Sequence, residues 1–212
     1  MIHFKRQDFD QLDHIYRINL INSCTGFKSA NLIGTKSNHG IANVAVFSSV
    51  THLGSNPPLL GIIFRPVSDV PRNTYENIKE TGQFTVNHVC ENFVEDAHHT
   101  SAKYDKAISE FGVTNLEEEY KNGWHAPFVK NAPVQMALTY CEEYKIKANN
   151  TVHLIAEIKD LFINDDLIEK DGFINLSKAK IMAINGLDGY TTPVLHKRLT
   201  YQRPKPLVHN NY

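Results

Sequence analysis

The sequence is poor in cysteine and has almost no excess charge. Its three cysteines, Cys24, Cys90 and Cys141, are far apart and form no CxxC pair. We therefore expect reduced thiols and a cytoplasmic location, and no disulfide framework. The 22 basic and 23 acidic residues give a net charge of −1. This near-neutral balance argues against a nucleic-acid-binding surface.

Long apolar runs and spaced metal motifs are also missing. No stretch approaches the ~18 consecutive apolar residues of a membrane span, and residues 1–20 contain no uninterrupted apolar region. We therefore expect neither a membrane segment nor a signal peptide. His98, His99 and His125 fit no pattern such as HExxH, so we expect surface histidines and no metal site.

The chain does contain enough apolar residues for a core. With 212 residues, of which 42% are hydrophobic, it suits one domain. Strand-like segments recur between turn signals, and two segments have helical patterns. We expect strands at 30–35, 41–51, 59–64, 83–89, 134–142 and 151–163, and helices at 74–81 and 92–102. The segment 17–21 is expected to be a strand or the lead into one. Antiparallel strands with a few short inserted helices predict a mainly β fold, a closed or partly closed barrel.

The stretch 41–51 is unusual for a core strand because one of its faces is polar. At period two, that face carries Asn43, Ala45, Phe47, Ser49 and Thr51. An amide and two hydroxyls cost a few kcal/mol if they are buried without partners, but little if they meet a polar ligand. We predict that the segment Asn56-Pro-Pro58 then breaks the strand pairing.

Arg72 stands just before the predicted helix, whose N-cap is expected at Asn73 or Thr74. A helix start offers free N–H groups and the positive end of a dipole, and Arg72 adds a forked cation. With the hydroxyls of Ser48 and Ser49 nearby, this combination suits a phosphate. The alternative is an ordinary helix cap beside a surface arginine.

Several fragments resemble the flavin reductase-like, FMN-binding split-barrel family, and they occur in the family's order. They are 43–51 (NVAVFSSVT), 56–61 (NPPLLG), 72–78 (RNTYENI), 82–87 (GQFTVN), 101–105 (SAKYD) with 110–111 (EF), and 152–157 (VHLIAE) with 171–172 (DG) and 186–190 (GLDGY). The resemblance implies an FMN-binding split β-barrel, a Greek-key antiparallel barrel with a few short helices, over residues 1–193. Residues 194–212 have no family counterpart and are expected to form an extended C-terminal tail.

The resemblance also implies a function. The expected activity is an NAD(P)H-dependent flavin reductase that transfers hydride from the nicotinamide to the flavin, with FMN as cofactor and FAD as its alternative. A homodimer is implied, and an oxygenase is a candidate partner. The alternative activity is electron transfer or an accessory role without nicotinamide turnover. A barrel without cofactor is the third possibility. The sequence does not distinguish NADH from NADPH, because it has no GxGxxG fingerprint.

The family motifs assign roles to individual residues. Ser48, Ser49, Thr51, Arg72, Asn73 and Thr74 are expected at the FMN phosphate. Asn43 and the backbone from Ala45 through Phe47 to Ser48 are expected at the edge of the flavin ring, and Tyr190 is expected over the ring or as a buried hydroxyl. His153 is the catalytic candidate on the nicotinamide side, with a core histidine hydrogen-bonded to backbone as its alternative. Asn185 stands near the place where the family pattern has an arginine.

Overall fold

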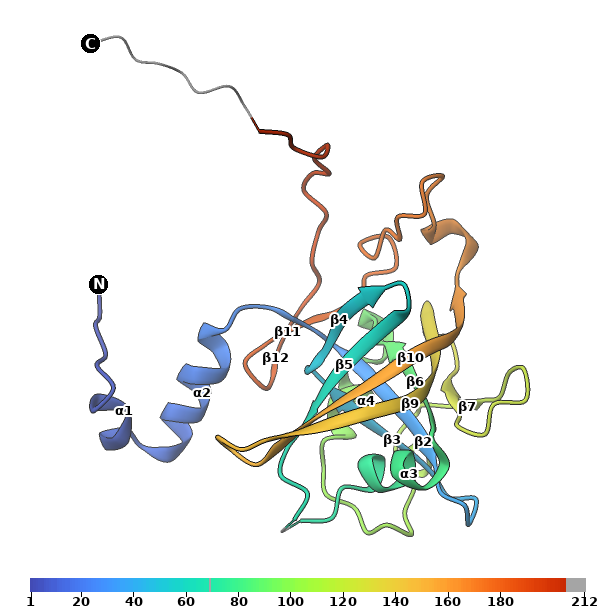
Figure 1. Ribbon diagram of the computed structural model, residues 1–212, viewed down its shortest axis with the longest axis horizontal. Helices are drawn as coiled ribbons and strands as arrows, with labels where there is room; N and C mark the ends of the chain where they lie inside the picture. The colour runs from blue at the N-terminus through green and yellow to red at the C-terminus, as the bar shows by residue number, and fades with distance from the viewer. Residues whose placement is uncertain (69, 205–212) are drawn as a thin grey trace.

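The computed structural model describes residues 1–68 and 70–204 (Figure 1). A seven-stranded antiparallel sheet with the strand order β3-β2-β6-β9-β10-β5-β4 makes the barrel. Its strands are β2 Asn31–Lys36, β3 Ala42–Phe47, β4 Val50–Ser55, β5 Pro58–Phe64, β6 Gln83–His88, β9 Val134–Ile146 and β10 Thr151–Ile163. This architecture confirms the split-barrel fold expected from the sequence.

Two smaller sheets and the helices surround the barrel. β1 Lys28–Ser29, β11 Ala183–Asn185 and β12 Gly189–Thr191 form one sheet, and β7 Glu118–Glu119 pairs with β8 Phe128–Val129. The α-helices are α1 Asp8–Gln11, α2 His14–Cys24, α3 Asn73–Thr81 and α4 Val94–His99, and the 3-10 helices are η1 Glu91–Phe93, η2 Glu110–Gly112 and η3 Asp165–Leu167. No helix in the described part of the chain is long and apolar enough to cross a membrane.

Apolar side chains form two clusters on opposite faces of the sheet. On β2, Leu32 belongs to one cluster and the next residue, Ile33, belongs to the other. Successive side chains of a strand point to opposite faces, so β2 is buried on both sides. The cluster that contains Ile33 fills the barrel with residues from β5, β6, β9 and β10, and Ile78 of α3 joins it.

The polar stretch 41–51 is two strands, and the prediction of one continuous strand is wrong. β3 ends at Phe47 and β4 begins at Val50, on the opposite edge of the sheet. The bend at Ser48 and Ser49 is stabilised where the Ser49 hydroxyl donates to the Ile63 carbonyl at 2.8 Å. The prediction that the segment 56–58 breaks the strand pairing is also wrong. This segment forms the turn of the β4–β5 hairpin, in which Ser55 pairs with Pro58.

The segment 17–21 is helical, so the strand expected there is wrong. It lies inside α2, whose N-cap Asp13 accepts hydrogen bonds from the N–H groups of Ile15 and Tyr16. This cap satisfies donors that a helix start leaves free, which favours helix over strand. α1 and α2 contain no buried residue and project from the barrel as an arm (Figure 1).

Smaller differences concern the ends of elements. Arg72, and neither Asn73 nor Thr74, is the N-cap of α3, while Gly82 ends this helix at φ 71° as expected. α4 covers only part of the predicted helix 92–102, and β9 continues beyond the predicted 134–142 to Ile146. Residues 192–204 form no regular element, and the tail residues 205–212 lie outside the described chain.

A substitution at Gly61 tests the packing of His153. A Cβ added at Gly61 would stand inside the contact distance of His153 Nε2, whereas one added at Gly112 would meet nothing within 4 Å. We expect Gly61→Ala to lower the free energy of unfolding by about 1–3 kcal/mol, a typical cost of overpacking. Gly112→Ala is the control. In a His153→Ala background the cost at Gly61 should shrink, as measured by urea denaturation; an equal cost in both backgrounds would contradict this contact.

Candidate functional site

β3 is an edge strand, and one of its long edges faces away from the sheet. The Val44 N–H does not pair with β2 but donates to Glu110 Oε2 at 3.0 Å. Residues of an antiparallel strand alternate in the side to which they direct N–H and C=O. The backbone N–H and C=O of Val46 therefore also point away from β2. β3 thus presents an adjacent donor and acceptor at its open edge.

A large cavity lies along this edge, and we call it the β3 cavity. Its volume is about 920 Å³. Its walls come from β3, the bend after it, the end of β5, the start of α3 and the loop 100–106, with smaller parts from α2, η2, β10 and the β11–β12 turn. Pockets of roughly 300–1,000 Å³ are usual for cofactors and other small ligands, so the β3 cavity is the candidate site.

One end of the β3 cavity is built for an anion. Arg72 lines it at the start of the nine-residue helix α3, and its Nε is buried without a hydrogen-bond partner among the described residues. Ser48, Ser49 and Thr74 line the same cavity. A buried guanidinium donor without a partner is costly, so an anionic ligand that accepts from Arg72 is physically favoured here.

Asn43 explains how β3 tolerates an amide in a buried position. Its side chain is only 6% exposed, and its Nδ2 donates to the Thr74 hydroxyl at 3.1 Å. This bond joins β3 to the first turn of α3 and relieves the cost of burying the amide. It also fixes the helix start beside the open edge of β3, so the anion end and the strand edge form one rigid wall.

Part of the lining of the β3 cavity is apolar. Phe47, Ile63 and Phe64 contribute to its lining. The rings of Phe47 and Phe64 pack edge to face, with centroids 5.3 Å apart. Such packing holds both rings in place. An apolar wall beside a hydrogen-bonding strand edge suits a flat heteroaromatic ligand that has polar atoms along one side.

The rim carries charges of both signs. Arg65, Lys103 and Asp105 line the β3 cavity and are exposed. Lys106 also lines it, and its Nζ is 2.8 Å from a Glu76 carboxylate oxygen. Because this last pair neutralises itself, Arg65, Arg72 and Lys103 account for most of the positive charge that a phosphate would meet.

Most of the residues expected to bind the cofactor line the β3 cavity. They are Asn43, Ala45, Phe47, Ser48, Ser49, Arg72, Asn73 and Thr74. Thr51 does not line it, because Thr51 lies on β4 and is exposed. Tyr190 does not line it either: its hydroxyl lies 3.1 Å from His98 Nδ1, and burial raises its pKa.

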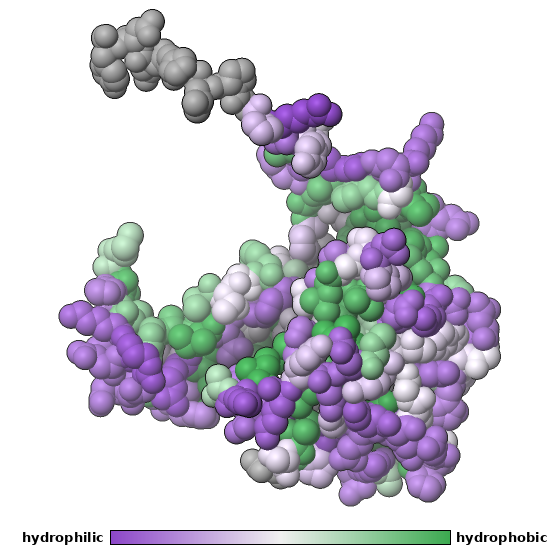
Figure 2. Space-filling model, in the orientation of Figure 1, coloured by the Kyte–Doolittle hydropathy of each residue, from purple (hydrophilic) through white to green (hydrophobic). Residues whose placement is uncertain are grey.

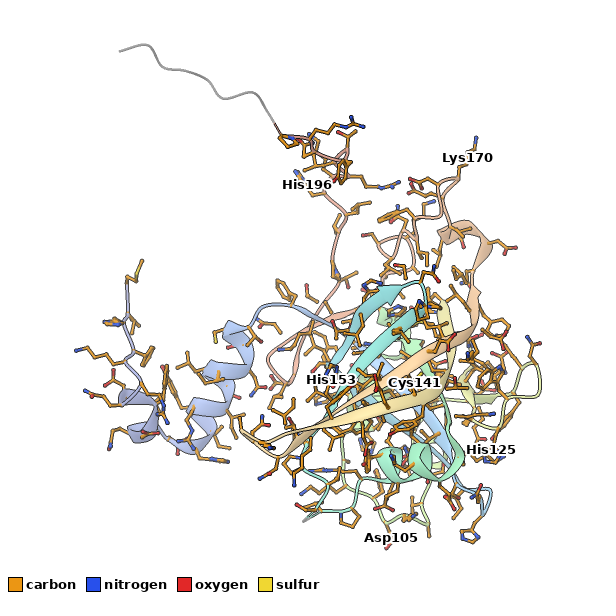
Figure 3. All side chains as sticks on the ribbon, viewed as in Figure 1. Asp105, His125, Cys141, His153, Lys170 and His196 are labelled. Carbon is orange, nitrogen blue, oxygen red and sulfur yellow. The ribbon has the colours of Figure 1, made fainter. Side chains whose placement is uncertain are left out.

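His153 lies on β10, outside the lining of the β3 cavity. Figure 3 shows its side chain on the sheet, well apart from Asp105 of the cavity rim. Its Nε2 is buried against Gly61 and has no hydrogen-bond partner within the described chain. His153 is therefore packed away from the cavity, but in the described part of the chain its Nε2 lacks the backbone hydrogen bond expected of the core alternative. Thr151, at the start of the same strand, is the β10 residue that reaches the cavity.

Several lining residues were not assigned a role from the sequence, and Glu110 and Thr151 are two of them. Glu110 stands in the fragment 110–111, but no pattern indicates that its carboxyl is buried. Thr151 begins the strand predicted at 151–163, but it carries no chemical signal of its own. Asn22 and Leu187 belong to the lining as well. Their contribution depends on the packing of the end of α2 against the β11–β12 turn, where Ser23 lies beside Gly186.

The profile of the "Flavin reductase like domain" family matches residues 27–202. The chain belongs to this family. The match covers all the strands of the barrel and the whole β3 cavity except Asn22.

Solved structures agree with this family. A candidate flavin reductase with a split barrel domain from Shewanella frigidimarina NCIMB 400 superposes with a TM-score of 0.92 at 44% identity, covering 95% of this chain and 100% of that one. Nitrilotriacetate monooxygenase component B from Bacillus cereus superposes with a TM-score of 0.82, but its 19% identity over 94% and 98% of the two chains shows the shared fold alone. An uncharacterised Aquifex aeolicus protein is 28% identical over 159 residues, 74% of this chain and 79% of that protein.

Proposed function

We propose that this protein binds FMN non-covalently in the β3 cavity and acts as an NAD(P)H-dependent flavin reductase. The observation that carries the proposal is the Arg72 Nε, which has no partner in residues 1–68 and 70–204, in a cavity that also contains an unpaired strand edge. The two features match the two polar ends of FMN, and family membership supports a flavin as the ligand. FAD is the alternative flavin.

The phosphate of FMN would lie at the anion end of the β3 cavity. Arg72 supplies the fixed positive charge, and the first N–H groups of α3 add the positive end of the helix dipole. The hydroxyls of Ser48 and Thr74 complete the donors on that side. Because these groups come from different elements that Asn43 joins, they are in place before the ligand binds.

The ring of FMN would lie along β3. Its pyrimidine edge places a carbonyl next to an N–H. The N–H and C=O of Val46 form the complementary pair, since both point away from β2. Phe47 and Phe64 offer the apolar wall for the rest of the ring. When bound, FMN supplies the hydride acceptor, and the protein supplies binding and orientation.

The function is tested with the purified protein, FMN and a nicotinamide. We expect bound FMN to give a flavin absorbance band that bleaches under anaerobic NADH or NADPH, and steady-state NAD(P)H oxidation with added FMN. Bleaching by dithionite but by neither nicotinamide would favour the electron-transfer or accessory role. A protein that takes up no FMN would exclude both readings.

The proposed partner is an oxygenase that accepts reduced flavin. Its support is the shared fold with a monooxygenase component B. Such a supply role requires FMN to leave the protein once it is reduced. Anaerobic gel filtration after NADH reduction should then show free flavin, whereas complete retention of the flavin by the protein would argue for electron transfer within a complex.

Replacement of Arg72 should affect FMN and riboflavin differently. Arg72→Ala removes a charged hydrogen-bond donor, which is worth about 1.5–3 kcal/mol. We therefore expect FMN affinity to fall by roughly one to two decades. Riboflavin lacks the phosphate and should bind the variant as it binds the wild type. Arg198→Ala is the control, because Arg198 pairs with Glu169 and Asp171 away from the cavity. Equal losses of affinity for FMN and riboflavin in a fluorescence titration would contradict the assignment of the phosphate site to Arg72.

We also propose that the protein is a homodimer in which the arm contacts the second copy. The 11-residue helix α2 has no fully buried residue, and Ile15 is 60% and Tyr16 53% exposed. Apolar side chains are visible along this arm in Figure 2. An isolated helix shorter than about 12–15 residues is marginal in water. A partner surface for this arm is therefore expected.

Substitutions on α2 test the dimer. Light scattering of the wild type should give twice the chain mass of 24.1 kDa. The double variant Ile15→Asp/Ile21→Asp should shift the mass to that of one chain, because it replaces two exposed apolar side chains of the arm with charged ones. Asn19→Asp, on the same helix, is the control and should remain dimeric. A wild type that runs as a single chain at micromolar concentration would refute the dimer.

A further inference from the structure

Glu110 is a buried acid that the proposed binding of FMN does not use. Its side chain is 5% exposed, and it lines the β3 cavity from η2. Its position is rigid. The neighbouring Phe111 is buried in the core cluster that also holds Val44, and the Thr114 hydroxyl donates to the Glu110 carbonyl at 2.7 Å.

The carboxyl has a hydrogen bond but no opposite charge. Oε2 accepts from the Val44 N–H, and none of the ion pairs in the described chain includes Glu110. β3, the strand packed against η2, carries no titratable side chain. α4, which packs on β3, carries Glu95, Asp96, His98 and His99, and the cavity adds Arg65, Arg72, Glu76, Lys103, Tyr104, Asp105 and Lys106. A carboxylate buried without a cation is costly, which favours its protonated form.

The open edge of β3 brings this acid close to the proposed ring site. A strand rises about 3.3 Å per residue, so Val44 and Val46 lie roughly 7 Å apart. A ring that pairs with Val46 therefore lies about two residues along β3, roughly 7 Å, from the Val44 N–H that donates to Glu110. Two charges at this separation still interact appreciably at the effective dielectric of about 20 found in proteins.

We propose that Glu110 takes up one proton when the flavin in the β3 cavity is reduced. The inference rests on the proposed function. Two electrons from a hydride donor or from dithionite add negative charge to the ring, and one proton from solvent then forms an O–H bond at the Glu110 carboxylate. No bond between the protein and the ligand forms or breaks. The proton neutralises the carboxylate that would otherwise repel the added charge.

The protein without flavin provides the first measurement. Burial raises the pKa of Glu110 above its ordinary value of 4.5, so the folded chain holds this proton more tightly than the unfolded chain. The stability that Glu110 contributes is therefore complete below pH 4.5 and is lost as the pH rises through the folded value. We expect Glu110→Gln to gain unfolding free energy relative to the wild type as the pH is raised from 4.5 to 8. No relative gain would show that burial does not raise the pKa of this carboxyl in the folded chain, and it would overturn the proposal.

The decisive measurement is the midpoint potential of bound FMN between pH 5 and 9. Wild type and Glu110→Gln should have the same potential at low pH, and the wild-type potential should become the more negative one as the pH rises. The difference should grow by at most about 30 mV per pH unit, which is one proton per two electrons. Glu95→Gln is the control: it removes an exposed carboxylate of α4, outside the lining of the β3 cavity, and should follow the wild type.

Each outcome decides the proposal. Parallel potentials for wild type and Glu110→Gln would overturn it while leaving FMN binding intact. If the glutamine variant does not retain FMN, the proposal is tested by measuring how many protons the FMN-bound wild type takes up from a weakly buffered solution when it is reduced. One proton taken from solution beyond those required by oxidation of the reductant and by the protonation state of the reduced flavin, judged from its absorbance spectrum, supports the role of Glu110. No such extra proton overturns it. If the wild type binds no FMN, both this proposal and the proposed function are refuted.

Discussion

The structure depends on the way the chain leaves one edge of the sheet after Phe47 and rejoins the opposite edge at Val50. This crossing leaves the backbone of β3 without a neighbouring strand on one side. Unpaired strand edges normally invite association with other chains, and proteins cover or interrupt them. Here the edge is covered at Val44 by the Glu110 carboxyl, and beyond that point it faces the β3 cavity. A feature that would be a liability elsewhere thus provides the hydrogen-bonding wall of a binding site.

The polar residues of this wall are held in place by bonds that join different elements. Asn43 binds Thr74, which connects β3 to α3, and Ser49 binds the Ile63 carbonyl, which connects the bend to β5. These bonds reduce the cost of burying an amide and a hydroxyl next to an apolar core. At the helix start, the buried Arg72 Nε has no hydrogen-bond partner among the described residues. The protein is therefore arranged before binding for a ligand with an anionic group at one end and a flat polar edge at the other.

Two parts of the chain bury little of their surface against the barrel. α2 contains no buried residue, and Val194 and Leu199 of the C-terminal segment are 84% and 74% exposed. The C-terminal segment is held through Arg198, which pairs with Glu169 and Asp171 and lies over the ring of Phe173. Because the barrel closes around its own core without them, these segments are available for contact with a second chain, and the barrel needs neither for its interior packing.

Periodicity and turn residues were sufficient for β2, β5, β6 and β10 and for the end of α3 at Gly82, because each depends on neighbours within a few residues. The family fragments also placed most of the lining of the β3 cavity. The bend at Ser48 and Ser49 could not be predicted, since alternation continues through it and only pairing with a distant strand reveals the change of edge. The helix at 17–21 was missed because its start depends on the Asp13 cap rather than on an apolar pattern. The burial of Glu110, the contact of Thr151 with the cavity and the packing of His153 on Gly61 were decided by tertiary structure alone, because each arises where elements far apart in the sequence meet.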